Sequence, residues 1–219
     1  MADRRSSKTY STAAESFEDL PDECWEIIFG RLLQLHHSHL EPASLSCKRF
    51  LSITNNLRTH FEITVPTLIP LSRLFKRFPR LNSLHFRTFR RGNDLDRVII
   101  DVATNSNLNL ETLKFSGTQL PLEGFKLLGS RMKNLKVLTC GNLATLRDSD
   151  LVVIADSMPS LEDLDISFPV NDFGASAGNE TLALHSSEKD VTDLGIEVLS
   201  SKLKGLRMID LSGYLTAIK

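Results

Sequence analysis

Apolar positions between residues 20 and 53 recur at helical spacing and predict three short helices. The first begins within residues 20–23, where proline suits the opening helical position and acidic side chains oppose the positive end of the helix dipole. The second spans about residues 40–45, with Pro42 in its first turn. The third runs from about Ser46 to Ile53.

The first helix carries more apolar residues than one buried face can use. Three helices in roughly forty residues are close to the lower size limit for a chain that folds unaided. Part of the surplus apolar surface is therefore expected to be covered by another protein. The apolar arc comprises Cys24, Trp25, Ile27, Ile28, Phe29 and Leu32.

A second pattern recurs after residue 80: a leucine, two residues, a leucine or isoleucine, one residue and a further apolar residue. Successive copies begin at residues 81, 110, 135, 161 and 206, and most of the intervals match the length of a leucine-rich repeat. Phe61 and Ile63 predict an earlier, irregular unit. The five copies are Leu81, Leu84 and Phe86; Leu110, Leu113 and Phe115; Leu135, Leu138 and Cys140; Leu161, Leu164 and Ile166; and Leu206, Ile209 and Leu211.

Helices are predicted between these strands, over residues 121–131, 149–158 and 192–203. Each begins near a proline or near a capping residue such as Ser149 or Asp193. Strand, loop and helix thus alternate along the chain, which predicts an α/β fold.

The N-terminal residues resemble the F-box, the segment through which substrate receptors attach to the Skp-type adaptor of a cullin ubiquitin ligase. Ser46 departs from the family, which usually has an apolar residue there. With the repeats that follow, the chain resembles plant F-box proteins that carry leucine-rich repeats. The matching residues are Leu20-Pro21-Asp22-Glu23, Ile27-Ile28-Phe29 with Leu32, Leu40, Leu45 and Cys47-Lys48-Arg49-Phe50.

The resemblance implies a domain order as well as a fold class. A polar arm over residues 1–16 is predicted to be disordered. The resemblance implies that residues 17–60 form a three-helix F-box and that residues 61–219 form a leucine-rich-repeat solenoid of about five strand-loop-helix units. A long loop near residues 169–189 is either a substrate contact or a tolerated excursion.

The implied function is that of the substrate-recognition subunit of a cullin-type E3 ubiquitin ligase. The F-box would bind a Skp-type adaptor, and through it a cullin, while the repeats present an unidentified target protein. The chain itself would not be an enzyme and would need no cofactor. The positions expected to contact the adaptor, or to support that contact, are Leu20, Pro21, Ile28, Leu32, Leu45 and Phe50.

Four alternatives remain open, and one of them, an enzyme, is disfavoured by the missing nucleotide-binding and hydrolytic motifs. The N-terminal helices could belong to one larger core with no partner, or the repeats could form an interaction scaffold without a ligase. The fourth alternative arises because the sequence stops eight residues after residue 211 with no polar capping repeat. The chain would then be a truncated receptor that occupies the adaptor without delivering targets.

Residues that alternate with the buried strand positions are expected to line one face of the repeats, which runs from basic to acidic. We hypothesise that the two ends orient a target segment of opposite polarity, against the alternative of a solvated, unoccupied surface. A further basic run, over residues 73–91, is either a site for an acidic partner or a solvated helix side. The target-binding candidates are His85, Arg87, Lys114, Asp163, Asp165 and Asp210.

Composition and motifs narrow the classes of ligand and the cellular compartment that are expected. The formal net charge of −1 gives no reason to expect binding to nucleic acid or to an anionic membrane. Three widely spaced cysteines predict free thiols in a reducing compartment, hence the nucleus or cytoplasm. Neighbouring histidines at 36, 37 and 39 lack the spacing of a metal site, and no nucleotide-binding or hydrolytic motif occurs.

Overall fold

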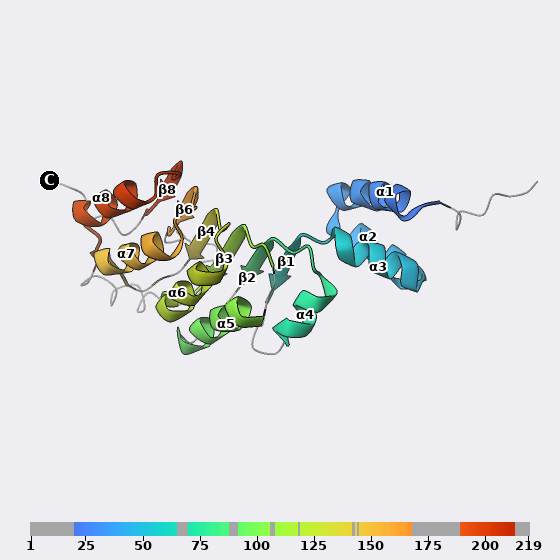
Figure 1. Cartoon of the computed structure of the whole chain (residues 1–219), viewed down its shortest axis with the longest axis horizontal. Helices are drawn as coiled ribbons and strands as arrows, with labels where there is room; N and C mark the ends of the chain where they lie inside the picture. Colours follow the sequence, from blue (N-terminus) through green and yellow to red (C-terminus); the bar gives the residue numbers. More distant parts are fainter. Residues whose placement is uncertain are drawn as a thin grey trace, which may run out of the picture. The chain divides into compact units, whose positions relative to one another are not determined.

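The computed structural model describes residues 20–212 except 65–69, 88–91, 106–107, 118, 142, 144 and 168–188. The chain divides into two compact units, which we call the N-terminal unit (1–57) and the C-terminal unit (58–219) (Figure 1). The predicted arm, and the predicted loop apart from Lys189, lie outside the described residues. In the part of the chain that is described, no helix has the length and apolar character needed to cross a membrane.

Over residues 20–57 the N-terminal unit folds into three α-helices, as the apolar spacing predicted. Pro21 occupies the N-cap of the first helix, immediately before its first residue. The third helix, predicted from about Ser46, begins two residues later at Lys48, because Cys47 is extended and separates the second helix from the third. The elements are α1 (Asp22–Leu35), the 3-10 turn η2 (His37–His39), α2 (Leu40–Ser46) and α3 (Lys48–Leu57).

Aromatic rings form the centre of the small N-terminal core. The Phe50 ring lies 4.5 Å from that of Trp25 and 5.0 Å from that of Phe29, measured between centroids. Leu40 and Ile53 complete the buried cluster. Close ring pairs of this kind add about 0.5–1.5 kcal/mol each beyond their buried area. This packing joins α1, α2 and α3.

The C-terminal unit is a mixed α/β structure built on a six-stranded parallel sheet with the order β1-β2-β3-β4-β6-β8. The strands of this sheet follow one another in chain order, and helices occupy one side of the sheet (Figure 1). The strands are β1 (His60–Ile63), β2 (Ser83–Phe86), β3 (Thr112–Ser116), β4 (Val137–Gly141), β6 (Asp163–Asp165) and β8 (Met208–Asp210). A second, two-stranded sheet pairs β5 (Leu146–Arg147) with β7 (Lys189–Asp190).

Within the C-terminal unit, consecutive helices along the chain contact one another. The last three helices begin and end within one residue of the predicted bounds, whereas α5 was not predicted. Its buried residues Leu95, Val98, Ile99 and Val102 follow helical spacing, so the signal was present. The helices are α4 (Leu71–Arg77), α5 (Gly92–Asn105), α6 (Leu122–Arg131), α7 (Asp148–Ser157) and α8 (Asp193–Lys202).

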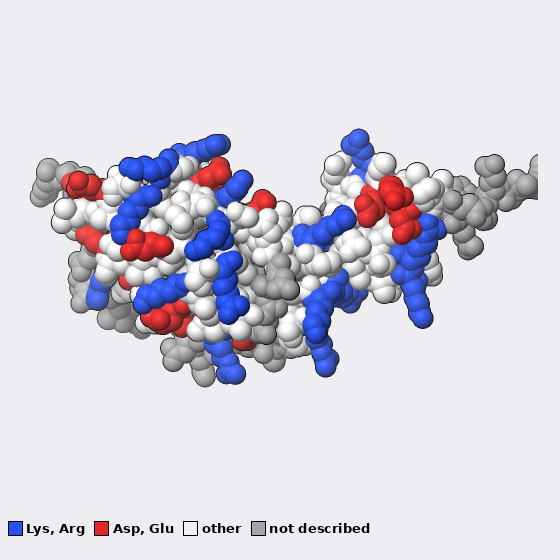
Figure 2. All heavy atoms as spheres, in the orientation of Figure 1, with Lys and Arg blue, Asp and Glu red and all other residues white. Residues whose placement is uncertain are grey.

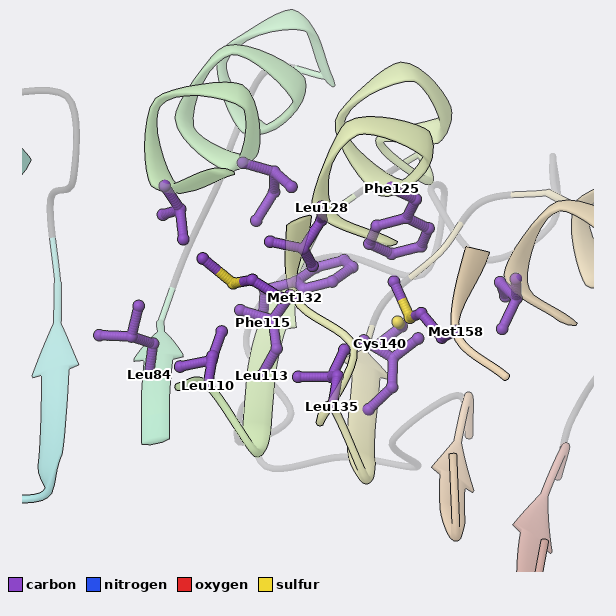
Figure 3. Packing of buried hydrophobic residues seen from close by; sticks show 14 of the residues in the cluster. Leu84, Leu110, Leu113, Phe115, Phe125, Leu128, Met132, Leu135, Cys140 and Met158 are labelled. Atoms are coloured by element: carbon purple, nitrogen blue, oxygen red, sulfur yellow. The ribbon is translucent and has the colours of Figure 1, made fainter. Parts of the chain in front are cut away.

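The repeated leucines occupy equivalent positions across the sheet. Leu84, Leu113, Leu138 and Leu164 are register partners in successive strands, and all four are fully buried. Side chains from the strands and from α6 meet in this core (Figure 3). Ile209 continues the row on β8, but 39% of its surface is exposed. The predicted burial is therefore confirmed for the first four copies and is incomplete in the fifth.

Carboxylates at the start of one helix hold the start of the next helix. Asp96 Oδ1 accepts a hydrogen bond of 2.9 Å from the Gly124 amide. The Asp148 carboxylate accepts bonds from the Thr192 amide at 2.8 Å and the Thr192 hydroxyl at 2.6 Å. Amides at the start of a helix lack partners within the helix. These bonds satisfy such amides and link α5 to α6 and α7 to α8.

The predicted helix caps were wrong by one or two positions. Thr192, not Asp193, caps α8, because its hydroxyl accepts a bond from the Leu194 amide. At α7 the Arg147 amide donates to the Asp150 carboxylate, so Ser149 is not the cap. Ser149 and Asp193 lie inside the first turn of their helices, whereas a capping group comes from the residue just before that turn.

Candidate functional site

The N-terminal unit exposes large apolar side chains that its own core does not use. On α1, Ile27 and Leu35 are 67% and 73% exposed, and Ile28 is 41% exposed. At 100° per residue these three lie within one arc, roughly opposite the buried Phe29. Leu45 on α2 is 84% exposed. We call Ile27, Ile28, Leu35 and Leu45 the exposed apolar set.

The six predicted contact residues fall into two groups. Pro21, Ile28 and Leu45 are exposed, so a partner can reach them. The remaining three, Leu20, Leu32 and Phe50, are half-buried and pack against the aromatic core. Leu35 was not among the predicted contact residues, although it lies seven residues after Ile28 and so shares its face. Figure 2 shows uncharged surface between the charged groups on this unit.

Arg49 joins the two ends of the N-terminal pattern, the start of α1 and the start of α3. Its Nε donates to Asp22 Oδ1 at 2.7 Å, and its Nη2 donates to the Leu20 carbonyl. The planar guanidinium offers several donors in a fixed geometry, which suits two acceptors at once. Arg49 therefore holds the residues before α1 against α3, a role that sequence analysis did not assign.

Replacing Arg49 with alanine is expected to lower the free energy of unfolding of the N-terminal unit by about 1–2 kcal/mol, because both bonds are lost. The only tryptophan of the chain is Trp25, so its fluorescence during urea denaturation reports on this unit. Lys48→Ala is the control, since Lys48 is the exposed neighbouring residue. Equal shifts in the two variants would contradict the role assigned to Arg49.

The polar residues of the sheet form rows across the strands. The middle row follows the register Glu62, His85, Lys114, Thr139, Asp165 and Asp210. On β2, β3, β4 and β6 these positions alternate with buried ones, and the register places Glu62 and Asp210 in the same row, so the row lies on the face opposite the helices. We call this the polar face of the sheet.

Basic side chains occupy the β2 and β3 part of the polar face. Arg87, just after β2, pairs with Glu62 through Nε and Oε1 at 2.5 Å. Among the described residues, Lys114 has no such carboxylate partner. Partial burial lowers the pKa of His85, and Lys114 and Arg87 lower it further against the opposing influence of Glu62. His85 is therefore largely neutral at pH 7, and Lys114 is the main unpaired charge.

Acidic side chains occupy the β6 and β8 part of the same face. Asp165 Oδ1 accepts bonds from the Ser167 amide and hydroxyl, and Asp210 Oδ1 accepts the same pair from Ser212. Asp165 and Asp210 are register partners, an arrangement in which like charges repel. The described part of the chain provides no ion-pair partner for either, and Asp163 Oδ1 is buried without a hydrogen bond.

Replacing Ser212 with alanine is expected to raise the pKa of Asp210. The Ser212 hydroxyl and then its amide are the main causes that lower this pKa, and the variant removes the first of them. An NMR titration of the Asp210 carboxyl carbon measures the change, with Ser200→Ala on α8 as the control. In the native protein the lowered pKa contributes stability above the ordinary aspartate pKa, and this contribution is lost as the pH falls through the folded-state value.

The structure brings the predicted target-binding residues together in two groups. His85, Arg87 and Lys114 lie on or beside β2 and β3, while Asp163, Asp165 and Asp210 lie on β6 and β8. Strand β4 separates the groups.

Arg87 belongs both to the basic run and to these residues, but the earlier part of the run lies on a helix rather than on the sheet. Arg73, Lys76 and Arg77 belong to α4, and Arg80 follows in the next turn. Arg77 lies 5.2 Å from the centre of the Phe78 ring. Arg90 and Arg91 lie outside the described residues.

Several remaining side chains bear on possible chemistry. Cys24, Cys47 and Cys140 are all free, and burial, followed by the nearby Asp165, raises the pKa of Cys140 well above its usual value. The Nδ1 atom of His36 lies 2.7 Å from the Ser38 hydroxyl. In the described ranges, no three His, Cys, Asp or Glu side chains are grouped so that they could hold a metal ion.

Neither a scan against models of protein families nor a search of curated proteins finds a match to this chain.

Proposed function

We propose that the chain is a substrate receptor of a cullin-type ubiquitin ligase. The N-terminal unit would act as an F-box that docks on a Skp-type adaptor. The C-terminal unit would act as a leucine-rich-repeat solenoid that holds a target protein. The exposed apolar set carries the first half of this proposal, because a unit of this size gains little from leaving four large apolar side chains in water.

Order, spacing and secondary structure support the resemblance to an F-box. The matched segment coincides with three α-helices, and its two ends are joined through Arg49. A helix with one apolar face in its own core and a second apolar face exposed is suited to helix-mediated docking. The resemblance supplies the identity of the partner, the Skp-type adaptor.

The strand register supports the repeat assignment. Apolar residues at the same position in each copy are register partners, and the successive strands lie in chain order with an intervening helix. Such stacking buries a continuous core that no single repeat could bury alone. The polar face is the surface on which the target would bind.

In this role the chain supplies no catalytic group. It would raise the effective concentration of target lysines near a conjugating enzyme held elsewhere in the ligase. A receptor of this kind would act in the nucleus or cytoplasm.

Co-purification with a Skp-type adaptor tests the proposal. The tagged full chain is expected to retain the adaptor, whereas the double variant Leu20→Ala with Pro21→Ala is expected to lose it. Trp25 fluorescence during denaturation checks that the variant still folds. Failure of the wild-type chain to retain any adaptor of this class would contradict the ligase role, and would favour a repeat scaffold that works without a ligase.

A further inference from the structure

We propose that the polar face binds an extended peptide segment in which an acidic and a basic residue are separated by about three or four residues. This inference rests on the proposed receptor role for its occupant, a segment of the target protein. The physical basis is the separation of charge along one row of the sheet. The segment would run across the strands, with its acidic residue near Lys114 and its basic residue near Asp165 and Asp210.

The basic end of the face has one dominant anchor. Lys114 is half-buried, and no described carboxylate forms an ion pair with it. Arg87 contributes less, since Glu62 already holds its guanidinium. A carboxylate from a ligand would therefore gain most from Lys114. Partial desolvation of such a pair strengthens it relative to a fully exposed surface pair.

The acidic end has more charge than its surroundings compensate. Asp165 and Asp210 face each other across adjacent strands, and each has Oδ1 engaged by a serine two residues later. Those bonds fix the carboxylates in place. One basic side chain between them would relieve the mutual repulsion while adding attraction to both.

The row spacing sets the length of the ligand. Neighbouring strands lie about 4.8 Å apart, so Lys114 is roughly 10 Å from Asp165 and roughly 14 Å from Asp210 along the row. An extended peptide advances about 3.3 Å per residue, which places complementary charges three or four residues apart. Thr139, on the strand between them, offers a neutral hydroxyl and leaves room for a small residue.

Selection of displayed random nine-residue peptides on the purified full chain tests this inference. The wild-type chain is expected to enrich peptides with the predicted pair of charges at the predicted spacing. Asp165→Asn with Asp210→Asn is expected to retain the acidic preference and lose the basic one. Lys114→Gln with Arg87→Gln is expected to show the opposite loss.

The most enriched peptide is then synthesised, and its affinity is measured by fluorescence anisotropy. Neutralising either end is expected to weaken binding about tenfold, since each removes roughly 1.4 kcal/mol of attraction. The matched control is Lys126→Gln with Arg131→Gln on α6, which removes the same charge away from the polar face and is expected to leave affinity unchanged.

Three results would overturn the inference. They are an absence of enriched peptides, enrichment of peptides with charge of one sign only, and a control variant that weakens binding as much as the others. Adaptor co-purification, measured on the same preparations, separates this outcome from the proposed function. A chain that selects the bipolar peptides but binds no adaptor would keep its peptide site and lose the ligase role.

Discussion

Replacing Ile28 and Leu45 together with glutamate is expected to weaken binding to a Skp-type adaptor at least about a hundredfold. Both side chains are exposed on separate helices of the N-terminal unit. The substitutions would remove apolar contact area and place two unpaired charges in an interface, at a cost of several kcal/mol. Titration calorimetry with the purified adaptor measures the loss.

The same double variant is expected to change the stability of the free chain by less than about 1 kcal/mol, because exposed positions contribute little to folding. A matched control is Leu194→Glu on α8, where an equally large apolar residue is 68% exposed in the other unit. This control should bind the adaptor normally. Normal binding by the Ile28 and Leu45 double variant would show that the exposed apolar set is not the docking surface.

Replacing Gly129 with alanine is expected to lower the free energy of unfolding of the C-terminal unit by about 3 kcal/mol. A Cβ atom at this position on α6 would lie 1.9 Å from the Ser157 carbonyl oxygen at the end of α7. That neighbour is backbone, so no rotamer change can relieve the overlap and the helices must move apart. Hydrogen-exchange mass spectrometry of α6 and α7 measures the loss of protection.

Gly30→Ala is the matched control, because it makes the same change inside α1. A Cβ there would meet no atom within 4 Å. Alanine is the better helix former, so this variant is expected to gain about 0.5–1 kcal/mol, read from Trp25 fluorescence during denaturation. If Gly129→Ala also stabilised the chain, close approach of α6 and α7 could not be the reason for glycine at residue 129.

Much of the C-terminal unit could be predicted because the same apolar pattern recurs in each repeat of its sequence. The leucine at the centre of each copy predicted a buried strand position, and Leu84, Leu113, Leu138 and Leu164 confirm it. Helix α5 was missed because β-branched residues such as Val98 and Ile99 also occur in strands. Spacing alone would have separated the two possibilities, since these residues recur with a helical period.

The sequence predicted which residues belong to the candidate sites, but not which of their charged groups are paired. Alternation along each strand predicts from the sequence that Lys114 and Asp165 lie on one face. Nothing in the local sequence showed that Glu62 pairs with Arg87, or that Asp210 faces Asp165. Those relations depend on strand register, which is set by the packing of distant segments.

The amino-acid sequence by itself determined which residues are apolar at which spacing, and therefore the helices of the N-terminal unit and most strands and helices of the C-terminal unit. Local periodicity is sufficient for this because each element buries one face. Only the tertiary structure decided which surplus apolar residues stay exposed on α1 and α2, that Arg49 links Leu20 to α3, and why Gly129 has no room for a side chain. Exposure and close approach are properties of pairs of segments far apart in the chain, and no single segment encodes them.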